Sequence, residues 1–180
     1  MSLLYRTILR PALFLQDSEK AHNRLISSLS VTSRSRLLLS LTGNLYGSPE
    51  LPVNLFGLDF PNPLGIAAGI DKNGEAVPAW QSIGFGFSEI GGVTLHDQLG
   101  NPRPRMFRAT AEKALVNRMG FNNIGAELIH DKLSDWKERG LWPDSPVGIN
   151  LGKSKITKLN DAPKDYSGSL EILWKHADFF

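Results

Sequence analysis

Four segments of the sequence join glycine to an amide or an ammonium group, a combination suited to binding a flat polar ligand. Glycine lets the backbone approach such a ligand closely, an amide offers both a donor and an acceptor, and a lysine ammonium binds anionic edges. A single lysine after a strand is usually solvated, but four such segments at one edge of a sheet predict a binding site. The segments are Ala68-Gly69-Ile70-Asp71-Lys72, Gly91-Gly92-Val93-Thr94, Asn117-Arg118-Met119-Gly120-Phe121 and Asn150-Leu151-Gly152-Lys153.

Several other kinds of site are excluded by what the 180 residues lack. There is no G-x-x-x-x-G-K-[ST] motif and no properly placed G-x-G-x-x-G motif, so neither a P-loop nor a dinucleotide fingerprint is predicted. The sequence has no cysteine and its four histidines lack metal-ligand spacing, so we expect no metal site, disulfide or thiol nucleophile. A net charge of +2 is too small for a typical nucleic-acid binder.

From residue 47 onward, strands that run into glycine alternate with helices. Apolar rather than alternating strands predict a parallel sheet covered by helices, with ligands at the carboxyl ends of the strands. We expect a small hairpin over 53–60, strands over 64–68, 87–93 and 146–151, helices over 75–83 and 122–139, and a last helix capped by Asp165. Residues 177–180 read as the start of a fourth strand, so we expect a chain truncated inside that strand.

Residues 1–46 differ in character from the rest. They carry six basic and two acidic side chains, a local charge of +4 against −2 for the remainder, and apolar residues recur at helical spacing. Asp17 is placed to cap a helix after an interruption at Pro11, which predicts a helical hairpin. Two interpretations stay open: a cap packed on its own domain, or a helix pair lying in a membrane interface. No stretch is long and apolar enough to predict a spanning helix or a signal peptide.

Long motifs identify a family resemblance that covers essentially the whole chain. Residues 62–74, 89–94, 100–108, 117–123 and 148–153 resemble dihydroorotate dehydrogenase, in the order and spacing of that family. Residues 17–22 resemble the extension of its class 2, quinone-dependent branch. The resemblance implies an α/β fold of the (β/α)₈ TIM-barrel family. Residues 1–46 would form a membrane and quinone-tunnel extension, and residues 47–180 the N-terminal portion of an FMN-binding barrel.

The resemblance also implies an activity. The family are flavoprotein oxidoreductases that oxidise dihydroorotate to orotate with FMN and pass the electrons to ubiquinone, in de novo pyrimidine (UMP) biosynthesis. A chain of this branch is expected at a membrane surface as a peripheral membrane protein; in a bacterium this is the cytoplasmic face of the inner membrane. The catalytic Ser base of the family is expected beyond Phe180, so we expect this chain alone to be inactive. Alternatives are a non-catalytic half-barrel that binds a membrane or a partner chain, and another FMN-dependent barrel oxidoreductase.

Site residues follow from the resemblance position by position. Gly92 departs from the pattern, since the family often has Thr or Ser there, but its backbone N–H remains available. Lys72 is implied to contact both flavin and substrate, Asn117 to hydrogen-bond the substrate ring, and Asn150 to contact the flavin. The resemblance assigns FMN to Ala68, Gly69, Ile70, Asp71, Lys72, Gly92 and Asn150, the substrate to Lys72, Asn117, Arg118, Met119, Gly120 and Phe121, and the quinone to His22 and Arg108.

Overall fold

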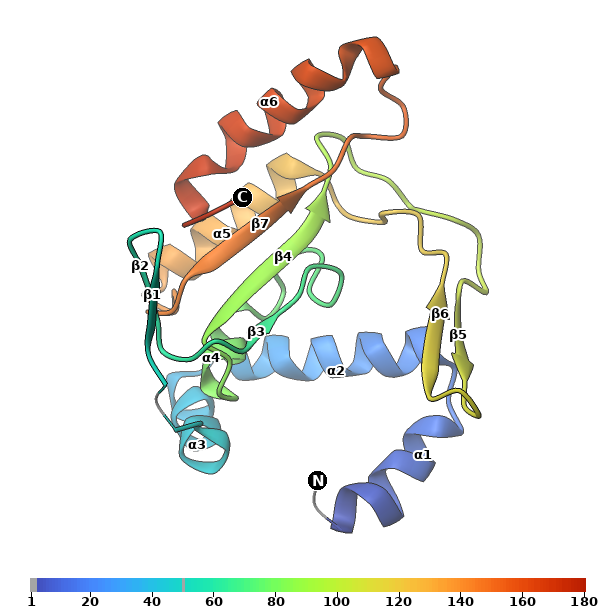
Figure 1. The fold of residues 1–180 in the computed structure, drawn as a ribbon, viewed down its shortest axis with the longest axis vertical. Coiled ribbons are helices and arrows are strands. Elements are labelled where there is room, and N and C mark those ends of the chain that lie inside the picture. The colour runs from blue at the N-terminus through green and yellow to red at the C-terminus, as the bar shows by residue number, and fades with distance from the viewer. Residues whose placement is uncertain (1–2, 50) are drawn as a thin grey trace.

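A three-stranded parallel sheet forms the centre of the molecule. The computed structural model describes residues 3–49 and 51–180, and its sheet has the strand order β3-β4-β7 (Figure 1). β4 occupies the predicted residues 87–93, and the other two strands are shorter than predicted. The three strands are β3 (Gly65–Ile66), β4 (Phe87–Val93) and β7 (Val147–Leu151).

The last residues of the chain lie along the open edge of β7. Phe179 forms a parallel bridge with Gly148, and its carbonyl accepts from Ile149 N at 3.1 Å. Asp178 N donates to Val147 O at 2.8 Å. This pairing agrees with the prediction that residues 177–180 begin a fourth parallel strand.

Three helices cover one face of the sheet and enclose the main core. The core holds fully buried apolar residues of α4, β4, α5, β7 and α6, and Trp136 Nε1 also donates to Gly74 O at 2.9 Å. Positions along β4 mostly alternate between buried and partly exposed, because these helices cover only one face of the sheet. The helices are α4 (Val77–Ser82), α5 (Ala126–Glu138) and α6 (Ala162–Leu173), with 3₁₀ turns at Leu159–Asp161 and Trp174–His176. The predicted hairpin over 53–60 is β1 (Val53–Leu55) and β2 (Leu58–Phe60).

The prediction that Asp165 caps the last helix is wrong. α6 begins three residues earlier at Ala162, where Pro163 occupies the first turn, a position that tolerates the missing N–H. Asp165 is buried inside the helix, and its carboxylate accepts from Ser154 N at 2.9 Å and from the Thr157 hydroxyl. The residue therefore fixes the loop after β7 rather than the helix start.

The N-terminal segment forms three helical pieces rather than the predicted hairpin. A π-helical turn at Tyr5–Leu9 runs into α1 (Arg10–Phe14), and α2 (Ser18–Ser33) and α3 (Arg36–Tyr46) follow. The Asp17 cap is confirmed, because its carboxylate accepts from Lys20 N at 2.9 Å. The hairpin prediction failed at Ser35, whose hydroxyl accepts from Leu38 N and starts a new helix. Among the described helices, none combines the length and apolarity that crossing a membrane requires.

The long helix α2 and its neighbour α3 pack on the sheet-covering helix α4. Buried Ala76, Ala79 and Trp80 meet Ile26, Leu29 and Leu39 in a second apolar cluster. Ala79 N also donates to the buried Ser33 hydroxyl at 3.2 Å. One face of the extension therefore behaves as a cap on its own domain.

An antiparallel hairpin that the sequence did not predict stands beside the N-terminal end of α2. It consists of β5 (Met106–Ala109) and β6 (Ala114–Asn117), apart from the central sheet (Figure 1). Ser18 Oγ donates to Met106 O at 2.6 Å, which ties α2 to this hairpin. Residues 103–108 are basic and contain proline, a pattern typical of a loop, so β5 was not predicted.

Candidate active site at the carboxyl ends of the parallel strands

One large cavity, of about 1280 Å³, lies between the carboxyl ends of the parallel strands, the β5–β6 hairpin and helices α1 and α2. Every residue predicted for the site lines it except Asp71. These residues are His22, Ala68, Gly69, Ile70, Lys72, Gly92, Arg108, Asn117, Arg118, Met119, Gly120, Phe121 and Asn150.

Two glycines leave part of the cavity floor without side chains. Gly69 has a positive φ of 99°, and a Cβ added there would meet no atom within 4 Å, so its open side faces space. Gly69 N donates to Gly91 O at 2.7 Å, which joins the turn after β3 to the end of β4. At Gly92 a Cβ would come within 3.1 Å of Phe121 and 3.4 Å of Asn150 Oδ1. This floor suits a flat heteroaromatic ring, with the Asn150 amide at its edge.

Lys72 supplies a cation beside this floor. Its side chain is half-buried, and among the described residues its ammonium has no hydrogen-bond or ion-pair partner. Burial lowers the pKa of Lys72, the positive charge of Arg105 lowers it further, and Glu19 opposes both. An unpaired ammonium in a partly dry cavity can stabilise negative charge on a bound ligand.

Asp71 points away from the large cavity and holds the turn together. Its carboxylate accepts from Glu75 N and Ala76 N, both at 2.8 Å, and from Trp80 Nε1 at 3.1 Å. Burial raises the pKa of Asp71, while these three hydrogen bonds oppose the rise. Its side chain thus fixes the start of α4 and the conformation that presents Lys72.

The loop over 117–121 is anchored from behind by Asn123, a residue outside the predicted site. The Asn123 amide donates to Thr94 Oγ1 at 2.9 Å and to Phe121 O at 2.8 Å, and its oxygen accepts from Gly125 N. Asn117 Oδ1 accepts weakly from Met119 N at 3.4 Å. The loop is therefore held at β4, and the Asn117 amide faces the cavity.

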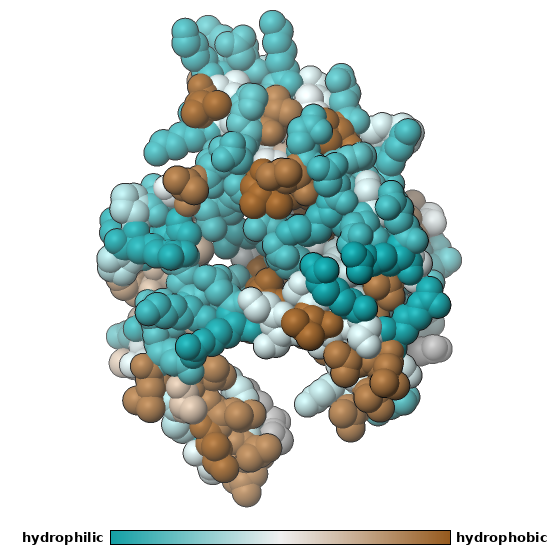
Figure 2. Space-filling view, turned by 180° about the vertical axis from the view of Figure 1, so that it is seen from behind, coloured by the Kyte–Doolittle hydropathy of each residue, from teal (hydrophilic) through white to brown (hydrophobic). Residues whose placement is uncertain are grey.

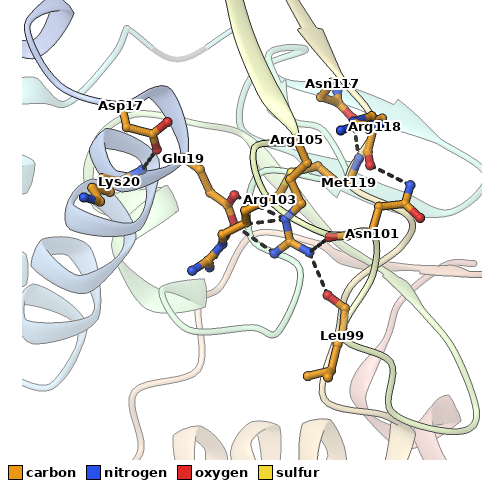
Figure 3. A network of polar contacts seen from close by, with 10 residues as sticks. All are labelled: Asp17, Glu19, Lys20, Leu99, Asn101, Arg103, Arg105, Asn117, Arg118 and Met119. Carbon is orange, nitrogen blue, oxygen red and sulfur yellow. Dashed lines mark hydrogen bonds and ion pairs between the residues drawn. The ribbon is translucent and has the colours of Figure 1, made fainter.

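A buried ion pair joins α2 to the loop before β5. Figure 3 shows the guanidinium of Arg105 against the carboxylate of Glu19. Arg105 Nη2 lies 2.8 Å from Glu19 Oε1. Both side chains are 7 % exposed, and Arg105 Nη1 also donates to Leu99 O and Asn101 O. The Arg105 hydrogen bond holds the pKa of Glu19 below its usual range, with a further contribution from Arg103. The pair fixes the helix that forms the cavity wall.

The two residues predicted for a quinone lie on this wall. Arg108 donates to Gln16 O at 2.5 Å and to Leu13 O at 3.2 Å, and its guanidinium lies 4.9 Å from the Phe14 ring centroid. It therefore ties the C-terminal end of α1 to β5. Burial lowers the pKa of His22, the charge of Lys72 adds to this, and Glu19 opposes it.

The sequence missed the apolar part of the lining. Ala21 and Leu25 were noted as a helical stripe, but stripes of this kind usually face a core, whereas these two face the cavity together with Ser28. The only sequence signal that this stripe faces a cavity rather than a core is the presence of two polar residues, Glu19 and His22, on the same helix. The further lining residues are Tyr5, Leu13, Phe14, Ser18, Arg24, Asn101, Met106 and Leu115.

Fold and site together define a class of protein. Parallel strands covered by helices, with a ligand cavity at their carboxyl ends, fit the TIM-barrel family of enzymes. The sequence model named "Dihydroorotate dehydrogenase" matches residues 50–180. The chain belongs to the dihydroorotate dehydrogenase family.

Individual relatives agree with this assignment. The chain is 49% identical over 179 residues to the dihydroorotate dehydrogenase (quinone) of Gloeobacter violaceus, covering 98% of this chain and 49% of the relative. It is 46% identical over 183 residues to that of Chloroflexus aurantiacus, covering 99% and 49%. The crystal structure of Eimeria tenella DHODH in complex with ferulenol matches with a TM-score of 0.73 and 35% identity, over 90% of this chain and 42% of that one. The chain thus spans about half the length of the curated relatives it matches.

Proposed function

We propose that this chain forms the N-terminal half of a quinone-dependent dihydroorotate dehydrogenase, which oxidises dihydroorotate to orotate with FMN and ubiquinone in pyrimidine biosynthesis. One observation carries the proposal: a single cavity joins a glycine-lined polar floor to apolar helical walls. The polar end suits a flat flavin and a polar ring, and the apolar end suits a lipid-like acceptor. The named relatives have about twice the matched length, so the other half of the barrel is part of the proposal.

The polar end fits FMN. Gly69 leaves open space above the turn, Gly92 offers its backbone N–H, and the amide of Asn150 lies within reach of Gly92. Bound FMN would supply two-electron redox chemistry. Lys72 would place positive charge beside the ring, and Asn117 would orient the substrate through an amide that both donates and accepts. The proton acceptor for the substrate is the Ser base that the family resemblance places beyond Phe180.

The apolar end fits a quinone. Leu13, Phe14 and Leu25 line it, and Arg108 has a planar guanidinium that still carries donors beyond its two carbonyl contacts. Such a donor can fix a quinone carbonyl while the apolar walls hold the tail. This arrangement would keep the acceptor and the substrate at opposite ends of one cavity.

The same helices support a peripheral membrane location. Figure 2 shows two hydrophobic lobes at one end of the molecule with a hollow between them. Their positions match α3 and the continuous helix formed by α1 and the π-helical turn before it, on which Ile8, Leu9, Leu41 and Leu45 are between 49% and 77% exposed. Apolar side chains on basic helices are the signature of interfacial binding, and the cavity would open toward the lipid that carries a quinone.

The membrane part is tested with vesicles of anionic phospholipid. Changing Leu41 and Leu45 to serine should lower the sedimenting fraction several-fold, because the apolar contact of α3 is lost. The matched control changes Leu99 and Ile156, which are 89% and 75% exposed elsewhere, to serine and should leave binding unchanged. Equal binding of both variants and the parent protein would reject the membrane role.

The catalytic part is tested by adding the half of a relative that this chain does not match. The C-terminal half of the Gloeobacter violaceus relative, fused after Phe180, should give a yellow protein that dihydroorotate bleaches and a short-chain ubiquinone re-oxidises. The 180-residue chain alone should do neither. Lys72→Met in the fusion should abolish bleaching, and a fusion that holds flavin but ignores dihydroorotate would contradict the proposal.

A further inference from the structure

A second, smaller cavity of about 380 Å³ lies between α2 and the turn that follows β3. Unlike the large cavity, its lining is mostly polar. Asn122 Oδ1, one of the atoms near it, is buried without a hydrogen-bond partner among the described residues. A polar cavity of this size holds water, which can satisfy such a group. The polar lining residues are His22, Asn23, Ser27, Ser30, Asp71, Lys72, Asn73, Glu75 and Asn122.

The two cavities share a wall. Four residues line both of them, namely His22, Ile70, Lys72 and Met119. Ile70 and Met119 carry no exchangeable side-chain proton. Lys72 belongs to the flavin and substrate end. His22 is the member of this wall that can take a proton on one ring nitrogen and give one from the other.

The chemistry at the apolar end requires such a group. Reducing a quinone to a quinol adds two electrons and two protons. A bound reduced flavin would supply the two electrons, and any proton that it did not carry would have to reach the quinone from water. Leu13, Phe14 and Leu25 make the acceptor end apolar, and this lining limits the access of bulk water to the acceptor.

The charges around His22 favour its neutral form. Glu19 and Arg24 lie on its own helix, Lys72 and Asp71 on the turn after β3, Glu75 before α4, and Arg108 on β5. Burial and the charge of Lys72 lower the pKa of His22. A neutral imidazole has one N–H to donate and one free nitrogen to accept, as a relay needs.

We propose that the polar cavity is the proton inlet of the protein and that His22 passes protons from its water to the quinone. In this step an N–H of His22 gives its proton to the anionic oxygen of the reduced quinone, and the other ring nitrogen takes a proton from a cavity water, which bulk solvent re-protonates. The imidazole is restored and no further oxidant or reductant takes part. The inference rests on the proposed function for the identity of the acceptor.

The first test uses the 180-residue chain and needs no turnover. The His22 Cε1–H resonance, assigned with His22→Asn, is titrated with pH with and without saturating ubiquinone-1. We expect His22 to titrate in both, because the polar cavity stays open when the large one is filled. Quinone binding that abolishes the His22 titration would overturn the relay alone. Absence of ubiquinone-1 binding would overturn the proposed function, and the relay with it.

The second test blocks the inlet. Ser30→Leu places an apolar side chain in the polar cavity, and Val31→Leu on the exposed neighbouring position is the control. With ubiquinone-1 bound, Ser30→Leu should slow or abolish the titration of His22, and Val31→Leu should leave it unchanged. Unaltered titration in a folded Ser30→Leu variant would show that protons arrive by another route.

The third test is kinetic and uses the fusion described above. His22→Ala should slow re-oxidation by ubiquinone-1 by about 100-fold, a usual effect of losing a proton-transfer group, while bleaching by dihydroorotate keeps its rate. Added imidazole should restore re-oxidation in proportion to its concentration. A purely structural role for His22 predicts no such rescue, so its absence in a variant that still binds ubiquinone-1 would overturn the proposal.

Discussion

Arg105 holds Glu19 by two guanidinium nitrogens, with Nε 3.1 Å and Nη2 2.8 Å from the same carboxylate oxygen, across a separation of 86 residues. The contact joins the first turn of α2 to the loop before β5. Because both side chains are buried, removing one partner leaves the other charge without compensation in a poorly solvated place. Among the contacts that connect the extension to the sheet domain, this buried ion pair is therefore costly to break.

Glu19→Ala should therefore lower the free energy of unfolding by about 3–5 kcal/mol, the usual cost of breaking a buried pair. Chemical denaturation followed by tryptophan fluorescence measures the change. Asp135→Ala removes a pair with Arg139 in which both side chains are more than 40% exposed, and it should cost under about 1 kcal/mol. Similar losses in the two variants would show that burial does not strengthen the Glu19 contact.

Asp71→Ala should destabilise the domain by on the order of 3 kcal/mol, because three donors lose their acceptor in a buried place. Asp71→Asn, which keeps one oxygen, should lose less. Thermal unfolding measures both. Asp59→Ala, which removes an exposed contact with Asn54, is the control and should change stability little. A tolerated Asp71→Ala variant would argue against a role for this carboxylate in fixing the turn before α4.

Arg108→Ala should release the C-terminal end of α1, because two carbonyls lose their donor and Phe14 loses one of the two guanidinium groups beside its ring. Limited proteolysis should then cut near residues 13–17 at least several-fold faster, and ubiquinone-1 should bind about tenfold more weakly. Arg10→Ala removes another guanidinium from the same ring, at 5.0 Å, and is the matched control. If both variants behave alike, the ring contact rather than the carbonyl contacts holds α1.

The protein should lose stability as the pH falls from about 6.5 to about 4, because burial, together with Lys137, His130 and Lys175, lowers the pKa of His176 to about 4. The unfolded chain takes up a proton near pH 6.5, whereas the folded chain resists it down to about pH 4, so protonation favours unfolding in this window.

The thermal midpoint measured between pH 7.5 and 4 should fall less in His176→Gln than in the parent protein. His96→Gln, at an exposed histidine, is the control. Parallel pH profiles for the parent protein and His176→Gln would assign the acid sensitivity to other groups.

Local patterns predicted the central strands well and the long-range contacts poorly. β4 was predicted at its observed bounds, Phe87–Val93, from a strand pattern that runs into Gly91-Gly92. β5 was missed because its basic residues are typical of a solvated loop. In the structure Arg105 instead contacts α2, and Arg108 contacts the end of α1. Such contacts depend on segments about 90 residues apart, and no local period encodes them.

The residues predicted for the site, largely through motifs of a known family, line the cavity apart from Asp71, whereas its apolar helical lining was missed. Spacing alone placed four glycine segments at one edge, and the structure brings residues of all of them to one cavity. Asp71 shows the limit of this reasoning, because its carboxylate stabilises the turn before α4 and does not line the large cavity. Asn123 shows the reverse, since it was part of a motif yet its role in anchoring the loop required coordinates.

The part of the large cavity that α1 and α2 line links ligand binding to the docking of these two helices. Because α1 and α2 supply part of the lining, a ligand that touches them binds only when they are in place. Mass action then stabilises the docked helices, by about 2.7 kcal/mol at a ligand concentration 100 times Kd. Protection of the N-terminal 46 residues from a protease thus reports binding directly, and a library of compounds can be screened on this protein without any turnover assay.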